Sequence, residues 1–198
     1  SEAAAFNQDL NNWQTASVTN MGSLFWKALN FNGNISDWDV SSVINMNQMF
    51  VQAEVFNQDL SDWNVSSVTD MGGMFNQAIN FSNDISNWDV SSVINMDRMF
   101  YYATNFNIDL TNWCVTNITN KPEAFNDDGG LADENLPIWG TCDKDMDGVR
   151  DNIDLDDQNY FIRYDNDNND LNDDCDPNYS ESGRTKIVLE IKRIWTAG

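Results

Sequence analysis

The nine residues WDVSSVINM occur twice, at residues 38–46 and again at 88–96. Sliding the chain against itself so that Phe6 falls on Phe31 keeps the later aromatic positions in register, with no insertion or deletion. Each 25-residue unit opens with a phenylalanine and carries a tryptophan seven residues later. These columns are Phe6, Phe31, Phe56, Phe81 and Phe106, and Trp13, Trp38, Trp63, Trp88 and Trp113. We therefore predict stacked repeats over residues 1–126.

Each unit has one part with helical spacing and one part that suits a strand. Apolar residues recur at helical spacing, as in Val43, Met46 and Phe50, and an Asn or Asp before the first Met suits a helix cap. The segment FNQDLSDW (56–63) suits a short strand, and coils stacked through such strands lie about 4.8 Å apart. The predicted fold class is an α/β repeat solenoid, with a short strand and a two-turn helix in each coil. Because SEAAA (1–5) matches the end of a unit, we expect the chain to begin within a coil of a longer protein.

The repeat FNQDLSDWNVSSVTDMGGMFNQAINF (56–81) resembles those of BspA-like bacterial surface proteins. This resemblance implies a right-handed, leucine-rich-repeat-like solenoid on a secreted or surface-attached chain, with a role in adhesion. It implies no catalytic residue. The fifth unit departs from the pattern at Lys121 and Pro122, so we interpret it as the last coil, followed by a connector or cap at 127–142.

The net charge of −22 excludes a nucleic-acid groove that works by neutralising phosphates, and it argues against an anionic membrane surface. No apolar run approaches the roughly 20 residues of a membrane span. The chain has no histidine, no phosphate-binding glycine loop and no recognisable nucleophile setting, so we do not expect an enzyme. Cations are the natural partners of such a chain.

Residues 143–176 have the spacing of calcium-binding loops. The segment DKDMDGVRDNID (143–154) places oxygen ligands at loop positions one, three, five, nine and twelve, with Gly148 at six and the carbonyl of Val149 at seven. A second copy lies at 165–176, although Asp170 replaces the glycine. The predicted metal ligands are Asp143, Asp145, Asp147, Val149, Asp151 and Asp154, and then Asp165, Asp167, Asn169, Asp173 and Asp176.

The flanks of these loops do not support an EF-hand, because Pro137 and Gly140 precede them and no helical period follows. The loops resemble thrombospondin type 3 repeats instead, which implies a calcium-stiffened extracellular segment. Extracellular calcium modules bind at roughly 0.1 to 1 mM, so such a site is filled outside a cell. The alternative is a disordered acidic linker.

Three cysteines, Cys114, Cys142 and Cys175, allow three disulfide pairings, and we favour Cys142 with Cys175. Residues 177–198 form a linker and a predicted C-terminal strand, since RTKIVLEIKRIW (184–195) alternates apolar with polar residues. We expect this strand to pair with a following domain, the solenoid flank or another subunit.

The two repeated columns of polar and aromatic residues have structural explanations. The tryptophan column suits a buried stack, with a sugar-stacking platform as the alternative. The column Asp9, Asn34, Asp59, Asp84 and Asp109 suits turns in which the side chain accepts backbone amides, with a cation-binding row as the alternative.

A ligand surface should lie where the units differ, and Trp26, Tyr101 and Tyr102 are the aromatic exceptions there. We predict an extracellular or cell-surface adhesin-type protein that binds a glycan or a matrix protein. The alternatives are a structural stalk with no ligand, and the non-catalytic region of a secreted polysaccharide-degrading enzyme.

Overall fold

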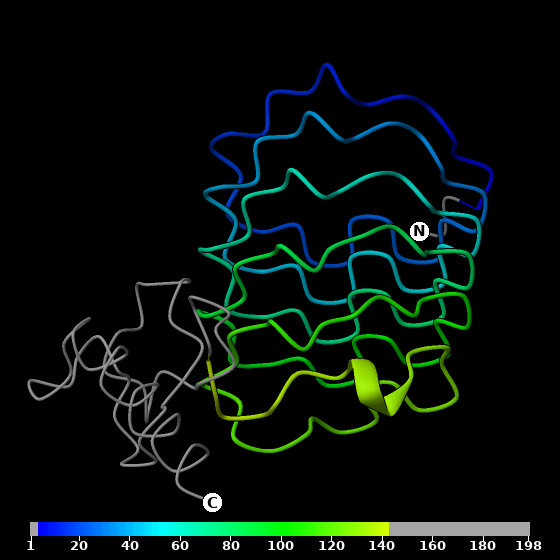
Figure 1. Ribbon diagram of the computed structural model, residues 1–198. Coiled ribbons are helices and arrows are strands. Elements are labelled where there is room, and N and C mark those ends of the chain that lie inside the picture. The colour runs from blue at the N-terminus through cyan, green and yellow to red at the C-terminus, as the bar shows by residue number, and fades with distance from the viewer. Residues whose placement is uncertain (1–3, 143–198) are drawn as a thin grey trace, which may run out of the picture. The chain divides into compact units, whose positions relative to one another are not determined.

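Stacked aromatic rings run through the coils of the computed structural model, which describes residues 4–142 (Figure 1). Figure 1 shows the coils lying one on another in chain order, from blue at the first to yellow beyond the last. In one column the rings of Phe25, Phe50, Phe75 and Phe100 repeat every 5.5–5.7 Å. A second column starts at Phe6 and continues through Phe106, and it packs against the first at 3.9–4.1 Å. The repeated phenylalanines therefore form the core.

The tryptophans tie each coil to the one before it. Four of them are 2–3% exposed, and each donates its ring Nε1–H to a backbone carbonyl 28 residues earlier, at 2.9–3.2 Å. These donors are Trp38, Trp63, Trp88 and Trp113, and the acceptors are Leu10, Ile35, Leu60 and Ile85. A buried indole needs such an acceptor, because an unpaired N–H inside a core costs free energy. The prediction that these tryptophans are core residues is confirmed.

Backbone hydrogen bonds join equivalent positions of neighbouring coils. Isolated parallel bridges connect Asn20 with Asn45, Asn45 with Asp70, and Asp70 with Asn95. Beside this ladder, alternate amides of each coil bond to the next coil: Ser23 N to Asn47 O, Phe25 N to Met49 O, and Lys27 N to Val51 O, at 2.8–2.9 Å. The intervening amides bond back three residues within their own coil, as Leu24 N does to Met21 O.

This alternation replaces the predicted helix. An α-helix would send every amide to the carbonyl four residues earlier in the same segment. Here two residues per coil have left-handed backbone angles, with φ between 55° and 62°, and they convert the segment into successive turns. These residues are Ser23, Gln48, Gly73 and Arg98, and then Lys27, Gln52, Gln77 and Tyr102. Within residues 4–142 the structure contains no α-helix and no strand longer than a single bridge residue.

The apolar residues at helical spacing nevertheless form part of the core. Met46, Met49, Phe50 and Ala53 are fully buried, because the turns bring these side chains to one side of the chain, as a helix would. The Asn or Asp that was expected to cap a helix accepts the backbone amide two residues later, at 2.8–3.0 Å. That residue is Asn20, Asn45, Asp70 or Asn95. The capping bond was predicted correctly, but it starts a run of turns.

The last coil is covered by the segment that follows it. Leu131 takes the place of the unit-opening phenylalanine and is buried, and Phe125 turns edge-on to both Phe100 and Trp139. The single helical element of the described residues, the 3₁₀-helix η1 (Asp133–Asn135), lies in this segment (Figure 1). Asn135 supplies a carbonyl to Leu110 N at 2.9 Å, as Asn34 does to Leu10. The segment therefore continues the hydrogen bonding of the stack with a different sequence.

Candidate binding surface

One corner of the stack carries several exposed or half-buried side chains that differ from coil to coil. At each of four successive coils, two adjacent residues occupy this corner, the second of which has a left-handed backbone. We use the name corner column for six of these eight residues: Trp26, Lys27, Gln52, Gln77, Tyr101 and Tyr102. The other two residues of these pairs are Val51, which is buried, and the half-buried Asn76.

Side chains of the corner column contact one another along the stack. The Lys27 ammonium lies 4.5 Å from the centre of the Trp26 ring, a cation–π contact. Gln52 Nε2 donates to Gln77 Oε1 at 2.9 Å, which links two coils by an amide pair. The column is thus a row of side chains with an amide pair at its centre and aromatic residues at both ends.

The tyrosine pair forms one end of the column. The rings of Tyr101 and Tyr102 meet edge to face, with 4.6 Å between their centres. The pKa of Tyr102 is raised above its ordinary value, first because the negative charge of Asp128 opposes ionisation and then because the hydroxyl bonds to that carboxylate. Tyr102 therefore remains a neutral, exposed phenol with its polar end anchored.

An apolar depression of about 410 Å³ adjoins the other end of the column. Phe6, Leu10, Trp13, Leu24 and Trp26 contribute to its walls. Trp13 is 56% exposed here, although its equivalents in the later coils are buried. One face of Trp26 lines this depression, and the residue as a whole is 38% exposed.

A second column of side chains, on another part of each coil, forms hydrogen bonds within the turns of that coil. Asp9, Asn34, Asp59, Asp84 and Asp109 each accept the backbone amide two residues later, at 2.9–3.1 Å. This bond is the structural role that the sequence predicted for the column. Among residues 4–142 there is no group of three or more acidic, cysteine or histidine side chains arranged to hold a metal ion.

Hydrogen bonds from serine stabilise the ionised form of three aspartates, Asp39 and two members of this column, Asp59 and Asp84. The hydroxyl and then the amide of Ser41 lower the pKa of Asp39, and those of Ser86 lower the pKa of Asp84. The amide and then the hydroxyl of Ser61 lower the pKa of Asp59. The carboxylates of Asp39, Asp59 and Asp84 therefore have a structural role in local turns.

Two overlapping segments, residues 1–59 and 33–139, match the family model described as "Mycoplasma protein of unknown function, DUF285". Together they span well over half of the 198 residues, and their overlap fits an internal repeat. The chain belongs to the DUF285 family. Comparisons with curated proteins and with solved structures gave no significant match.

In this DUF285 chain the three aromatic residues predicted to form a ligand surface are accessible but do not make one continuous patch. Tyr102 is 42% exposed and Tyr101 half-buried, and the two touch. Trp26 occupies the same corner three coils away, and Val51 and Asn76 separate it from Tyr101. The aromatic residues therefore mark the two ends of one column.

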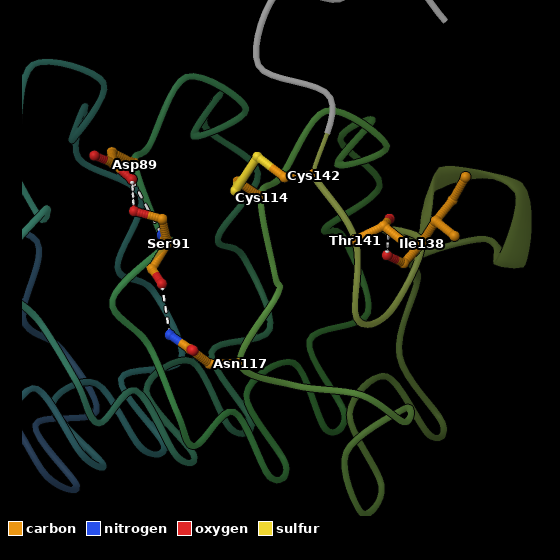
Figure 2. Close-up of a disulfide and its surroundings, with 7 residues drawn as sticks. All are labelled: Asp89, Ser91, Cys114, Asn117, Ile138, Thr141 and Cys142. Atoms are coloured by element: carbon orange, nitrogen blue, oxygen red, sulfur yellow. Dashed lines mark hydrogen bonds between the residues drawn. A yellow bond between two sulfur atoms is a disulfide. The ribbon is translucent and has the colours of Figure 1, made fainter. Parts of the chain in front are cut away.

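The predicted disulfide between Cys142 and Cys175 is wrong, because Cys142 bonds to Cys114 (Figure 2). The backbone explains this pairing: Val115 N bonds to Thr141 O at 2.9 Å, which brings the two cysteines beside each other with Cα atoms 4.2 Å apart. Figure 2 also shows the neighbouring turn, where Asn117 Nδ2 donates to the Ser91 carbonyl of the preceding coil at 2.7 Å. The disulfide thus fastens the covering segment of this DUF285 chain to its last coil.

Several predictions fall outside the described residues. The calcium ligands at 143–154 and 165–176, the linker, and the C-terminal strand all lie beyond Cys142. Within residues 4–142 no helix is long and apolar enough to cross a membrane.

The amide members of the corner column were missed by the sequence analysis. Gln52 and Gln77 are ordinary surface residues when each is considered alone. Their separation by one repeat unit, at the position directly after the column of Trp26 and Tyr101, was the signal that places them in a row.

Proposed function

We propose that this chain is a secreted or cell-surface interaction protein of the adhesin type, without catalytic activity. Its first part would be a right-handed repeat solenoid, related to the BspA-like surface proteins, that presents a ligand-binding surface. Residues 143–176 would form a calcium-stiffened segment of the thrombospondin type 3 kind. The repeat and family assignment fit this proposal, because the chain repeats one unit in register over most of its described length.

The observation that carries the proposal is the contrast between repeated residues, which form the core and the turns, and variable residues, several of which are exposed. From the second coil on, the repeated phenylalanines, tryptophans and methionines are buried, and the repeated Asn and Asp residues are used in turns. Several of the residues that change from coil to coil, among them Trp26, Gln77 and Tyr102, lie in the corner column, where they are exposed or half-buried. A scaffold that holds its variable residues on a rigid row is suited to recognition rather than to chemistry.

The disulfide supports an extracellular location. Disulfides form and persist in oxidising compartments and are rare in reducing ones. The Cys114–Cys142 bond closes the end of the repeat region, where opening would expose Phe125 and Trp113. An extracellular location would also supply the millimolar calcium that loops of the 143–154 type require.

The test is binding of the full chain to immobilised glycans and matrix proteins, with millimolar calcium and, in parallel, with a chelator. Saturable binding supports the adhesin-type function. Absence of binding to any ligand, together with a large calcium-dependent rise in melting temperature, would instead support the alternative of a stiff structural stalk.

A further inference from the structure

The corner column has unused hydrogen-bonding capacity at its centre. The bond from Gln52 Nε2 to Gln77 Oε1 leaves the carbonyl oxygen of Gln52 and the amide group of Gln77 without a hydrogen bond within residues 4–142. One is an acceptor and the other a donor, and both residues are half-buried. The centre of the column therefore offers complementary polar groups to a ligand that carries hydroxyls.

The ends of the column offer flat, apolar faces with a polar edge. Trp26 is 38% and Tyr102 42% exposed, and the Tyr102 ring packs edge to face against Tyr101. Rigid aromatic faces bind the C–H side of a sugar ring, while amides bind its hydroxyls. The combination of aromatic ends and an amide centre is the chemistry that recognises carbohydrate.

The step of the column fits an extended chain of sugar rings. The buried phenylalanine rings of successive coils are 5.5–5.7 Å apart. The corner residues also recur once per coil, and a repeat of this size is close to the length of one sugar ring in a fully extended β-linked chain. Four coils contribute to the column, from Trp26 to Tyr102. A straight polymer that lies parallel to the stack would meet the column at every ring.

The charge of the protein decides which polymers are compatible. Residues 4–142 carry 16 acidic side chains against three basic ones. A uronic acid or sulfated polymer would be repelled by this field. The ligand should therefore be uncharged.

We propose that the corner column binds an uncharged, extended, β-linked polysaccharide that runs along the stack, with one sugar ring over each coil. This inference rests on the proposed adhesin-type function and names its ligand class. Trp26 and Tyr102 bind the two terminal rings of a four-ring stretch, and Gln52 and Gln77 bind the hydroxyls of the two rings between them.

The first experiment is calorimetric titration of the full chain, in millimolar calcium, with four sets of probes. These are β-1,4-linked glucose oligomers of two to six units, N-acetylglucosamine oligomers of the same lengths, an α-1,4-linked glucose hexamer, and an oligogalacturonate. We expect binding to one or both β-linked series, with affinity that rises up to four units and then levels off. The curved α-linked hexamer and the anionic oligomer should bind at least tenfold more weakly.

The second experiment uses variants of the column. Trp26→Ala and Tyr102→Ala should each weaken binding about tenfold, which is the effect of losing one aromatic contact. The double variant Gln52→Ala and Gln77→Ala should also weaken it. Ile94→Ala is the matched control, since Ile94 is 67% exposed at a different position of the coil and should leave binding unchanged. The melting temperature of each variant separates loss of binding from loss of folding.

Each outcome decides a different point. Binding of β-linked oligomers that survives all the corner variants would overturn the assignment to this column. Saturable binding to a matrix protein, without any glycan, would overturn the carbohydrate inference and leave the proposed adhesin-type function standing. If neither glycans nor matrix proteins bind, the inference fails and the proposed function loses its support as well.

Discussion

The first and the last coil of the described residues are built from the same repeat but present different surfaces. At the first coil, Trp13 is 56% exposed and Leu24 is 46% exposed. At the last coil, the equivalent Trp113 is 2% exposed, and the segment 127–142 with its disulfide covers that end. Trp13 and Trp113 occupy the same position of the repeat. Their burial is therefore determined by the neighbouring segment and not by the residue itself.

The comparison also shows how one interface can be made in two ways. Between coils, the cover is another copy of the repeat, with stacked aromatic rings 5.5–6.4 Å apart in pairs such as Phe50 with Phe75 and Trp38 with Trp63. At the last coil, Trp139 packs edge-on against Phe125 instead, and Leu131 is buried at the position of the unit-opening phenylalanine. Phe125 is as fully buried as Phe75. A non-repeated segment thus reaches the same burial by different packing.

The largest expected effect comes from a matched pair of tryptophan substitutions. Trp63→Ala should lower the free energy of unfolding by about 3 to 5 kcal/mol, because it leaves a cavity and removes the bond to Ile35 O. Trp13→Ala should cost less than about 1 kcal/mol, since this ring is already largely in water. Urea unfolding followed by the fluorescence of the remaining tryptophans measures both. Equal losses would contradict the view that the neighbour determines the contribution.

Removal of the disulfide should have the next largest effect, and it should be confined to the covered end. Replacing both Cys114 and Cys142 by alanine should cost about 3 kcal/mol, since the bond closes a loop across a sequence separation of 28. Hydrogen exchange should show faster exchange at Val115 N, whose acceptor is Thr141 O. Amides of the second and third coils, such as Phe50 N, serve as the internal control. Unchanged protection at Val115 would mean that packing alone holds this end.

Backbone strain should behave differently from burial, because it is independent of the neighbouring coil. Gly73 has a φ of 62°, and a Cβ there would make only ordinary contacts, the nearest with Gln48 at 3.4 Å. Gly73→Ala should therefore cost about 1 kcal/mol through its left-handed backbone alone. Gln48→Ala is the control, since Gln48 already has this backbone with a side chain. Urea unfolding measures both, and a loss at Gly73 several times larger than expected would indicate a steric clash instead.

The smallest expected effect is a pH dependence shared by exposed turns. The pKa values of Asp39, Asp59 and Asp84 are lowered by bonds from serine, so these bonds stabilise the fold above the ordinary value of 3.8. Their contribution is lost as the pH falls below 3.8 and the carboxylates take up protons. We therefore expect a triple variant, with Ser41, Ser61 and Ser86 replaced by alanine, to be slightly less stable than the parent at pH 6.

The difference between parent and variant should shrink at pH 2.5. Urea midpoints at the two pH values give this difference directly, and using it removes the general effect of net charge. A gap that widened in acid would contradict the assigned sign. The effect is small because the three carboxylates are exposed.

Much of the repeat could be predicted from sequence, and the reason is physical. Phe50 and Trp63 stack on their equivalents in the neighbouring repeats. Because this stacking requires the same residue type in each coil, the sequence shows a period of 25 residues. Asp84 could be placed in a turn because a short acid with a serine two residues later has one common use. These predictions depended on contacts that recur in every coil.

The errors arose where the sequence signal has two structural solutions. Buried residues three and four apart, such as Met46, Met49 and Phe50, fit a helix and also fit successive turns, and only the left-handed angles of Gln48 and Gln52 distinguish them. A glycine at these positions would have indicated a positive φ, but a glutamine does not. The partner of Cys142 depended on the path of the segment after the last coil, which places Thr141 beside Val115. That segment is not a copy of the repeat, so the periodicity did not predict its path.

The hydrogen bonds between coils also determine how the molecule would respond to force. Each coil is bonded mainly to the coil before and the coil after it, through pairs such as Phe25 with Met49 and Phe50 with Met74. Tension applied along the stack would load these bonds one interface at a time, so coils should peel off singly. Each 25-residue coil would then release roughly 80 Å of chain. Between Cys114 and Cys142 the disulfide would hold that length back, so the stack should behave as an extensible spring with a fixed stop at one end.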